Sequence, residues 1–272
     1  MDGGWETVGR TAVAGTGAWY MYGVTTDLPP APPHPDKGRS VRAMFDAIAP
    51  RYDVANAVLS VGVDRSWRRR AVDAALAKAP RDVLDVATGT ADLALALAKA
   101  APDARVVGVD FAEAMLNVGR AKARRRGVDV ALEVGDGLAL DAADGSVDAV
   151  TIAFGLRNFA DVDAGLREVR RVLRPGGRLV VLEFPPPPRG PFGWAFRLYF
   201  LRILPFLGGL VTGHPGAYGY LPQSTLAFPP PEALATRMEA AGFDAVTYRT
   251  LTFGVAALHV ADVAPHPTEV PA

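Results

Sequence analysis

The residues best suited to chemistry are three aspartates associated with consecutive apolar runs. Asp85 lies in the run that opens "VLDVATGTADLAL" (83–95), Asp110 ends the next run, and Asp136 follows the third. The carboxyl ends of parallel strands share one edge of a sheet, so these carboxylates are expected to line one ligand site. Asp also caps helices and turns, which is the alternative for each residue taken singly. The presence of three aspartates at consecutive strand ends favours a shared ligand site over three separate caps.

The loop after the first run distinguishes two classes of cofactor. Dinucleotide folds use G-x-G-x-x-G here to bring backbone amides to a pyrophosphate, whereas this loop has only Gly89. Asp85 and Asp92 bracket the turn and would repel a pyrophosphate. S-adenosylmethionine carries no phosphate, and its ammonium and sulfonium attract carboxylates. The loop therefore favours the methyl donor.

The other two carboxylates fit the rest of that donor. Asp110 can accept hydrogen bonds from both ribose hydroxyls, which suits NAD and S-adenosylmethionine alike. Asp136, with Gly137 beside it, can accept from the adenine amino group. A dehydrogenase of the Tyr-x-x-x-Lys type is disfavoured, because no lysine follows a tyrosine by four positions.

Composition excludes several classes of function. The chain has 272 residues, of which 50% are hydrophobic and 21% charged, and this balance is typical of a globular protein. A net charge of zero gives no indication of a nucleic-acid partner. The absence of cysteine excludes disulfides and thiol nucleophiles and fits a cytoplasmic protein. The four histidines lack metal-ligand spacing, so we predict no metal site.

The elements that must position these residues alternate regularly along the chain. Strands are predicted over 82–87, 105–110, 128–134, 147–153 and 178–183. Helices are predicted over 39–49, 64–79, 91–100, 112–126 and 161–173, the last capped by Asp161. A helix over 231–241 and a hairpin of 245–251 with 255–263 complete the chain. This order predicts an α/β fold with a doubly wound, mostly parallel, seven-stranded sheet and a terminal hairpin.

We expect one folded domain over residues 37–263, with an N-terminal helical lid and a helical insert at 185–230 before the last helix. Residues 1–36 lack a sustained apolar period and the pattern of a signal peptide, which predicts a disordered extension. Residues 264–272 are predicted to be a flexible tail.

Four stretches carry a resemblance to a known family. They are "MFDAIAPRYDVANAVLSVGVDRSWRRR" (44–70), "VLDVATGTADLA" (83–94), "TIAFGLRNFADVDAGLREVRRVLRPGGRLVVLEF" (151–184) and "LTFGVAALH" (251–259). From about Lys37 to Val260 the chain resembles the quinone C-methyltransferases of menaquinone and ubiquinone biosynthesis. The resemblance implies a class I S-adenosylmethionine-dependent methyltransferase fold. It also implies C-methylation of a reduced polyprenyl quinone, with demethylmenaquinol as the expected acceptor.

Alternatives remain at this point. The acceptor could be a benzoquinol of the ubiquinone type or another small aromatic or lipid molecule, and the chain could be a non-catalytic scaffold of a quinone-pathway complex. The resemblance adds Thr90 and Ala153 to the expected donor-binding residues. The family usually has Gly at Thr88 and Ala91, and Ser at Ala153. A methyl at Ala91 could therefore shift the methionine end of the donor.

Four residues are candidates for catalysis. A ring carbon becomes nucleophilic when an adjacent hydroxyl of a quinol is deprotonated, so the site must stabilise a phenolate. Arg157 could bind the phenolate or hold a water that takes its proton, and Asn158 could orient a quinol oxygen. Tyr52 and Asp53, in the lid, could close over the ring, with Asp53 or a water as the base. Each could instead be a surface, turn or packing residue.

The apolar stretch 191–213 fits a substrate with an isoprenoid tail. Arg197, Arg202 and Pro205 argue against a membrane span. We expect either an interfacial helix that admits the tail of a polyprenyl naphthoquinol or a buried helix that covers the sheet edge. The first alternative predicts peripheral contact with the inner face of a membrane. A homodimer is a further expectation, and a nucleic-acid partner is not expected.

Overall fold

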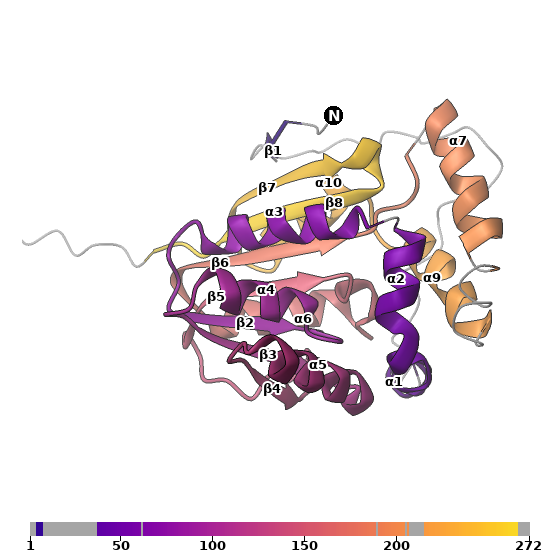
Figure 1. Ribbon diagram of the computed structural model, residues 1–272. Coiled ribbons are helices and arrows are strands. Elements are labelled where there is room, and N and C mark those ends of the chain that lie inside the picture. Colours follow the sequence, from indigo (N-terminus) through magenta and orange to yellow (C-terminus); the bar gives the residue numbers. More distant parts are fainter. Residues whose placement is uncertain are drawn as a thin grey trace, which may run out of the picture.

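One mixed sheet organises the chain. The computed structural model describes residues 4–7, 37–60, 62–188, 190–204, 206 and 215–265, and in these residues the sheet has the order β1-β7-β8-β6-β5-β2-β3-β4 (Figure 1). The strands are β1 (Glu6–Thr7), β2 (Asp82–Val86), β3 (Arg105–Asp110), β4 (Ala131–Val134), β5 (Val147–Ala153), β6 (Leu173–Glu183), β7 (Asp244–Leu251) and β8 (Ala256–Asp262). Strands β2 to β6 are parallel, whereas β7 and β8 are antiparallel neighbours. The predicted doubly wound sheet and terminal hairpin are confirmed, but the sheet has eight strands rather than the predicted seven, because β1 pairs with β7.

Helices cover both faces of the sheet because its strands are apolar on both sides. One hydrophobic cluster joins the sheet to α3 (Asp64–Leu76), α4 (Asp92–Ala100) and α5 (Glu113–Arg126). A second joins the opposite face to α6 (Val162–Val172) and α10 (Pro231–Ala240). The chain leaves β2 for β3 and β4 and then returns to β5 on the other side of β2. This reversal opens a crevice at the carboxyl ends of β2 and β5, where ligands bind in such folds.

Several predicted boundaries move by a few residues. Strand β4 begins at Ala131 rather than at 128, and α3 ends at Leu76 rather than at 79. Helix α6 is capped as predicted, since the Asp161 carboxylate accepts a hydrogen bond from the Ala164 amide at 2.9 Å. Strand β6 begins directly after α6, and residues 175–177 form an irregularity within it rather than a connection before it.

The N-terminal prediction needs a correction. Residues 6 and 7 are not disordered, because they form β1 against β7, the strand that would otherwise end the sheet. The Tyr248 hydroxyl donates to Glu6 at 2.7 Å, and the Arg249 guanidinium lies 4.6 Å from the Trp5 ring centre. Residues 1–3 and 8–36 of the predicted extension, and 266–272 of the predicted tail, lie outside the described residues.

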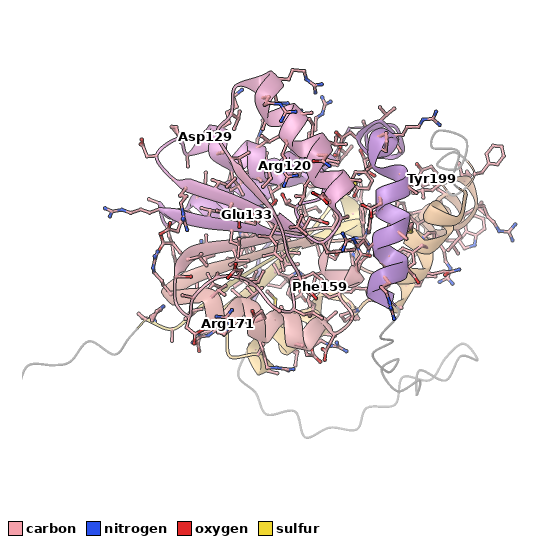
Figure 2. The ribbon with its side chains drawn as sticks, turned by 90° about the horizontal axis from the view of Figure 1, so that it is seen from below. Arg120, Asp129, Glu133, Phe159, Arg171 and Tyr199 are labelled. Atoms are coloured by element: carbon pink, nitrogen blue, oxygen red, sulfur yellow. The ribbon has the colours of Figure 1, made fainter. Side chains whose placement is uncertain are left out.

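Two helical segments stand at the carboxyl edge of the strands (Figure 1). The lid consists of α1 (Lys37–Ile48), a turn at Ala49–Arg51 and α2 (Tyr52–Leu59). The insert comprises α7 (Pro191–Leu198), a π-helical turn at Tyr199–Ile203 and α9 (Pro215–Ala227). Figure 2 shows Tyr199 of the insert beside the lid, on the side of the molecule opposite Asp129. Lid and insert touch, because Phe200 and Leu204 pack against Ala55 of α2.

Candidate active site

A cavity lies at the carboxyl ends of β2, β3 and β5. Its wall includes the loop after β2, residues that follow β3 and β5, and two lid residues, Phe45 and Tyr52. Three carboxylates reach it, those of Asp85, Asp92 and Asp110, together with the guanidinium of Arg68. The predicted acidic site at this edge is therefore present. We call it the donor cavity.

Asp85 is the most deeply buried of these acids, at 1% exposure. The hydroxyls of Thr88 and Thr151 each donate to its carboxylate at 2.6 Å. Burial nevertheless raises the pKa of Asp85 to about 6. Thr88 stands where the resembled family has glycine, and here its hydroxyl supplies a hydrogen bond to a buried acid. Gly108 of β3 makes room for it, since a Cβ there would lie 2.9 Å from the Thr88 hydroxyl oxygen.

Asp110 shapes the loop as well as the cavity. Its carboxylate accepts hydrogen bonds from the amides of Gly89 and Ala112, both at 2.8 Å. Burial raises its pKa too. A carboxylate oxygen can accept more than one hydrogen bond, so Asp110 retains acceptor capacity on the cavity side for ribose hydroxyls.

Ala91 does not line the donor cavity. It is fully buried, with a left-handed backbone at φ 63°. Its methyl faces α5, where a Cβ on Gly119 would approach it to 3.0 Å. Glycine is the residue that adopts this backbone without strain, so alanine costs about 1 kcal/mol here. The methyl thus occupies the packing between the loop and α5 rather than the space for the methionine end of a donor.

The remaining predicted donor-binding residues divide into two groups. Thr90 and Ala153 line the donor cavity. Asp136 is exposed beyond β4, where its carboxylate accepts from the Leu138 amide at 2.9 Å, and neither it nor Gly137 is among the lining residues. They lie at the same sheet edge, since Val134 pairs with Asp110. Their contact with adenine stays a prediction.

Asn158 is a buried polar residue on the donor cavity. Asn158 is only 8% exposed and lies in the short helical turn after β5. Its Oδ1 atom has no hydrogen-bond partner among the described residues. A buried acceptor without a partner costs about 1–3 kcal/mol, so a ligand N–H or O–H is the expected occupant of this position.

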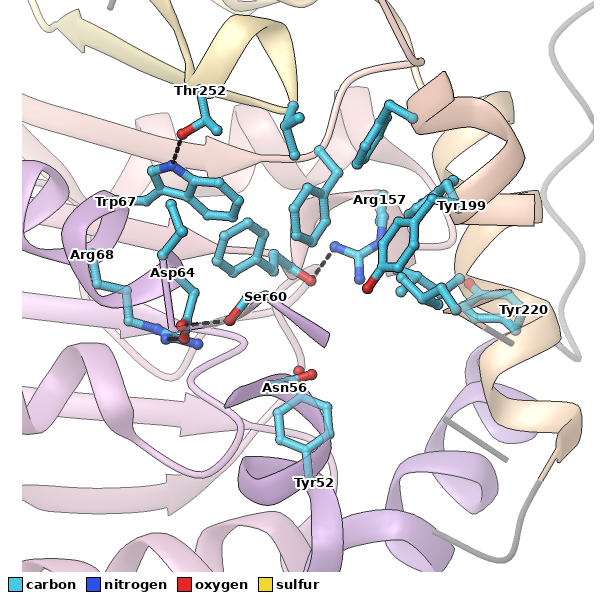
Figure 3. A pocket seen from close by; sticks show the side chains of 18 of the residues that line it. Tyr52, Asn56, Ser60, Asp64, Trp67, Arg68, Arg157, Tyr199, Tyr220 and Thr252 are labelled. Atoms are coloured by element: carbon cyan, nitrogen blue, oxygen red, sulfur yellow. Dashed lines mark hydrogen bonds and ion pairs between the residues drawn. The ribbon is translucent and has the colours of Figure 1, made fainter. Parts of the chain in front are cut away.

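A second cavity of about 280 Å³ lies between the lid, α3 and the insert (Figure 3). We call it the acceptor cavity. Its wall is mainly aromatic: Phe154 and Phe184 stack with ring centres 4.5 Å apart, and Trp67 meets Phe184 edge-on at 5.9 Å. The Trp67 indole donates to Thr252 at 2.8 Å, which fixes its orientation. Such a wall suits a flat, apolar ring.

The two cavities adjoin. Phe45, Tyr52, Arg68 and Phe154 line both of them. A ligand in the donor cavity would therefore meet a ligand in the acceptor cavity at these side chains. This juxtaposition is what transfer of a group between two bound molecules requires.

Arg157 brings a buried cation to the acceptor cavity. It is 8% exposed, and its Nη1 atom donates to Glu183 at 2.6 Å and to the Phe154 carbonyl. Glu183, at the end of β6, is 1% exposed and also accepts from the Phe184 amide at 2.8 Å. Glu183 was not among the site residues predicted from the sequence. Its signal was an acid at the end of an apolar strand, the same signal that identified Asp110.

The two lid candidates lie in different places. Tyr52 lines both cavities, and burial raises the pKa of its phenol. Asp53 lines neither: its carboxylate accepts from Thr90 at 2.6 Å and pairs with Lys122 at 2.8 Å. This placement does not favour Asp53 as a base, because its oxygens are held by the protein on the side of α5. Lys122 is itself buried.

Comparison with known proteins agrees with this geometry. The family model described as the ubiE/COQ5 methyltransferase family matches residues 35–262. The chain belongs to this family. It is 63% identical to "Demethylmenaquinone methyltransferase" of Thermus thermophilus over 80% of this chain and 99% of that protein. It is 45% identical to "Ubiquinone/menaquinone biosynthesis C-methyltransferase UbiE" of Geobacter sulfurreducens, over 84% of this chain and 90% of the relative.

Solved structures agree on the fold alone. A Thermotoga maritima structure described as a SAM-dependent methyltransferase has a TM-score of 0.57 at 18% identity, over 81% of this chain and 98% of that one. The [4+2]-cyclase SpnF has a TM-score of 0.58 at 18% identity, over 87% of this chain and 98% of that one. The class I methyltransferase fold expected from the sequence is therefore present.

Proposed function

We propose that this protein transfers the methyl group of S-adenosylmethionine to a ring carbon of a reduced polyprenyl quinone, with demethylmenaquinol as the acceptor. The observation that carries the proposal is the pair of adjoining cavities. One is acidic and the other is aromatic with a buried arginine. The name of the relative at 63% identity supports the same acceptor.

The donor cavity fits S-adenosylmethionine. Asp85 and Asp110 offer carboxylates to a cationic amino acid moiety and to ribose hydroxyls, and the Oδ1 atom of Asn158 offers a buried acceptor. When bound, the donor supplies an electrophilic methyl group on its sulfonium. The acidic residues hold the positive charge of the donor beside the acceptor cavity, whose aromatic wall excludes water from the reacting centre.

The acceptor cavity supplies what a quinol needs to become a nucleophile. A guanidinium stays charged at all relevant pH values, so Arg157 stabilises a phenolate oxygen and lowers the pKa of the quinol hydroxyl. Glu183 holds the guanidinium in place through the 2.6 Å ion pair. The buried phenol of Tyr52 remains protonated at neutral pH and can donate to a quinol oxygen, since its pKa is raised.

The direct test uses purified protein, labelled S-adenosylmethionine and three acceptors: demethylmenaquinol, a demethylated benzoquinol with the same tail, and a naphthoquinol without a tail. We expect labelled product from demethylmenaquinol, detected by mass spectrometry, and little from a demethylated benzoquinol or a tail-less naphthoquinol. Product from the benzoquinol alone would replace the proposed acceptor. A chain that binds the donor in calorimetry but methylates none of the three, or that fails to bind it, would favour the scaffold alternative.

The insert, which forms part of the wall of the acceptor cavity, also presents exposed apolar side chains. Trp194 and Phe206 are each 71% exposed, and Leu198 is 50% exposed, while Phe196 from the same segment lines the cavity. Among the described residues no helix is long and apolar enough to cross a bilayer. Aromatic side chains of this kind insert at the headgroup level of a membrane, and the apolar tail of a polyprenyl quinol partitions into the bilayer beneath. We propose that this surface gives the tail access from the bilayer.

Substituting Trp194→Asp together with Phe206→Asp should reduce binding to anionic vesicles about tenfold or more, because two large apolar groups no longer enter the interface. Co-sedimentation with these vesicles measures the bound fraction of each variant. Val134→Asp on the distant edge strand β4, where Val134 is 51% exposed, is the matched control. Equal binding by the double variant and the control would contradict the proposal.

The homodimer expected from the sequence stays a prediction.

A further inference from the structure

One buried ammonium connects the lid to the donor cavity. Lys122 projects from α5 and is only 3% exposed. Its Nζ atom lies 2.8 Å from a carboxylate oxygen of Asp53, 2.6 Å from one of Asp92 and 3.0 Å from the Thr90 hydroxyl oxygen. An ammonium has three protons, and these three oxygens are acceptors for all of them.

The three partners come from two parts of the site. Thr90 and Asp92 line the donor cavity from the loop after β2 and the first turn of α4. Asp53 belongs to α2 of the lid and also accepts from the Thr90 hydroxyl at 2.6 Å. The same short helix carries Tyr52 and Asn56, which line the acceptor cavity. The Lys122 ammonium, together with the Thr90–Asp53 hydrogen bond, thus holds the lid helix against the loop that contacts the donor.

The electrostatics make this arrangement depend on the cation. The cluster contains two carboxylates and one ammonium, and the carboxylates of Asp53 and Asp92 are partly exposed, at 34% and 31%. Without the ammonium, the half-exposed Arg126 would still lie 4.0 Å from Asp92, but no ion pair among the described residues would join that cation to Asp53. Like charges repel more strongly near a protein surface than in bulk water. Loss of the cation should therefore push α2 away from the loop.

We propose that Lys122 is a positioning residue that fastens the lid onto the donor loop, so that donor binding and lid closure support each other. The inference rests on the proposed function for its effect on methyl transfer. The ammonium itself lines neither cavity and touches no reacting atom. It acts through Asp53 on the lid side and through Thr90 and Asp92 on the donor side.

The test compares Lys122→Met with Lys99→Met in the full chain. Lys99 is exposed on α4, so its variant controls for the loss of a lysine. In Lys122→Met we expect backbone amides of α2 to exchange hydrogen about 10- to 100-fold faster, the range for losing charged hydrogen bonds, while amides of β2 and β5 keep their protection. S-adenosylhomocysteine should protect α2 further in the unmodified protein and in Lys99→Met, but not in Lys122→Met.

Kinetics give a second readout. The KM for the donor should rise in Lys122→Met, and Lys122→Arg, which keeps the charge, should recover part of the loss. Asp53→Asn should have the same effects as Lys122→Met, and the double variant should be no worse than either, because both changes break one connection. Fully additive effects would overturn the proposal.

Hydrogen exchange distinguishes this inference from the proposed function. If the unmodified protein methylates no quinol, the proposed function fails, while exchange in α2 still measures the connection. Loss of protection throughout the sheet of Lys122→Met would make Lys122 a residue of general stability and overturn the inference. Unchanged exchange in α2 would overturn it as well.

Discussion

Replacing Arg157 with methionine should lower kcat about 1,000-fold and leave the affinity for S-adenosylmethionine nearly unchanged. Removing one preorganised group that stabilises a developing oxyanion costs about 100- to 1,000-fold, and here the group carries a full charge. Arg157 lines the acceptor cavity but is absent from the wall of the donor cavity. Single-turnover rates and calorimetry of donor binding measure the two quantities separately.

The buried partner of Arg157 determines how the variant must be designed. Glu183 is 1% exposed, so removing the guanidinium alone leaves a buried, unpaired carboxylate that costs about 3–5 kcal/mol. Arg157→Met combined with Glu183→Gln removes both charges and should fold while remaining inactive. Arg105→Met, on a side chain that is 73% exposed, is the control. A double variant with normal kcat would contradict the assigned role of Arg157.

Lowering the pH below 6 should weaken donor binding, with Asp85 as the main cause. The pKa of Asp85 is raised to about 6 by burial, and only its ionised form attracts a cationic donor. If binding is coupled to one proton, the affinity for S-adenosylmethionine should fall about tenfold for each pH unit below the pKa of Asp85. Calorimetry from pH 5 to 8 measures the slope.

Asp85→Asn tests the source of this slope. The variant should bind the donor about 10- to 100-fold more weakly at pH 7.5, because a charged hydrogen bond is lost. The part of the pH dependence that remains should come from Asp110, whose pKa is also raised by burial. Asp129→Asn, exposed at the opposite side of the molecule from Tyr199, is the control (Figure 2). An unchanged slope in Asp85→Asn would exclude Asp85 as the titrating group.

The same raised pKa affects stability. A carboxyl whose folded-state pKa of about 6 exceeds its ordinary value of 3.8 holds its proton more firmly in the folded state. Its contribution is fully present below pH 3.8 and is lost as the pH rises through 6. Asp85 therefore disfavours folding at neutral pH by about 3 kcal/mol. Asp85→Asn should show a smaller decline in the free energy of unfolding between pH 4 and pH 7 than the unmodified protein.

Local sequence patterns predicted most of the framework. Strands β3 and β5 have the predicted boundaries, since a buried parallel strand is a short apolar run with clear ends. The helix cap at Asp161 and the terminal hairpin were also predicted correctly from the sequence. Helix α2 was missed as a separate element, because it is short and follows Pro50 in a turn. The strand β1 depends on a partner edge, β7, that is distant in the chain.

By itself, the sequence determined which chemistry the donor loop can accommodate. Carboxylates that bracket the loop disfavour a pyrophosphate and suit a cation whatever the detailed packing, because charge is a property of the residues. Only the tertiary structure decided which way individual side chains point. It places the methyl of Ala91 against α5, sets Asp53 on Lys122 rather than in a cavity, and pairs Arg157 with Glu183. These outcomes depend on contacts between distant segments, and a linear pattern does not contain the distances that select them.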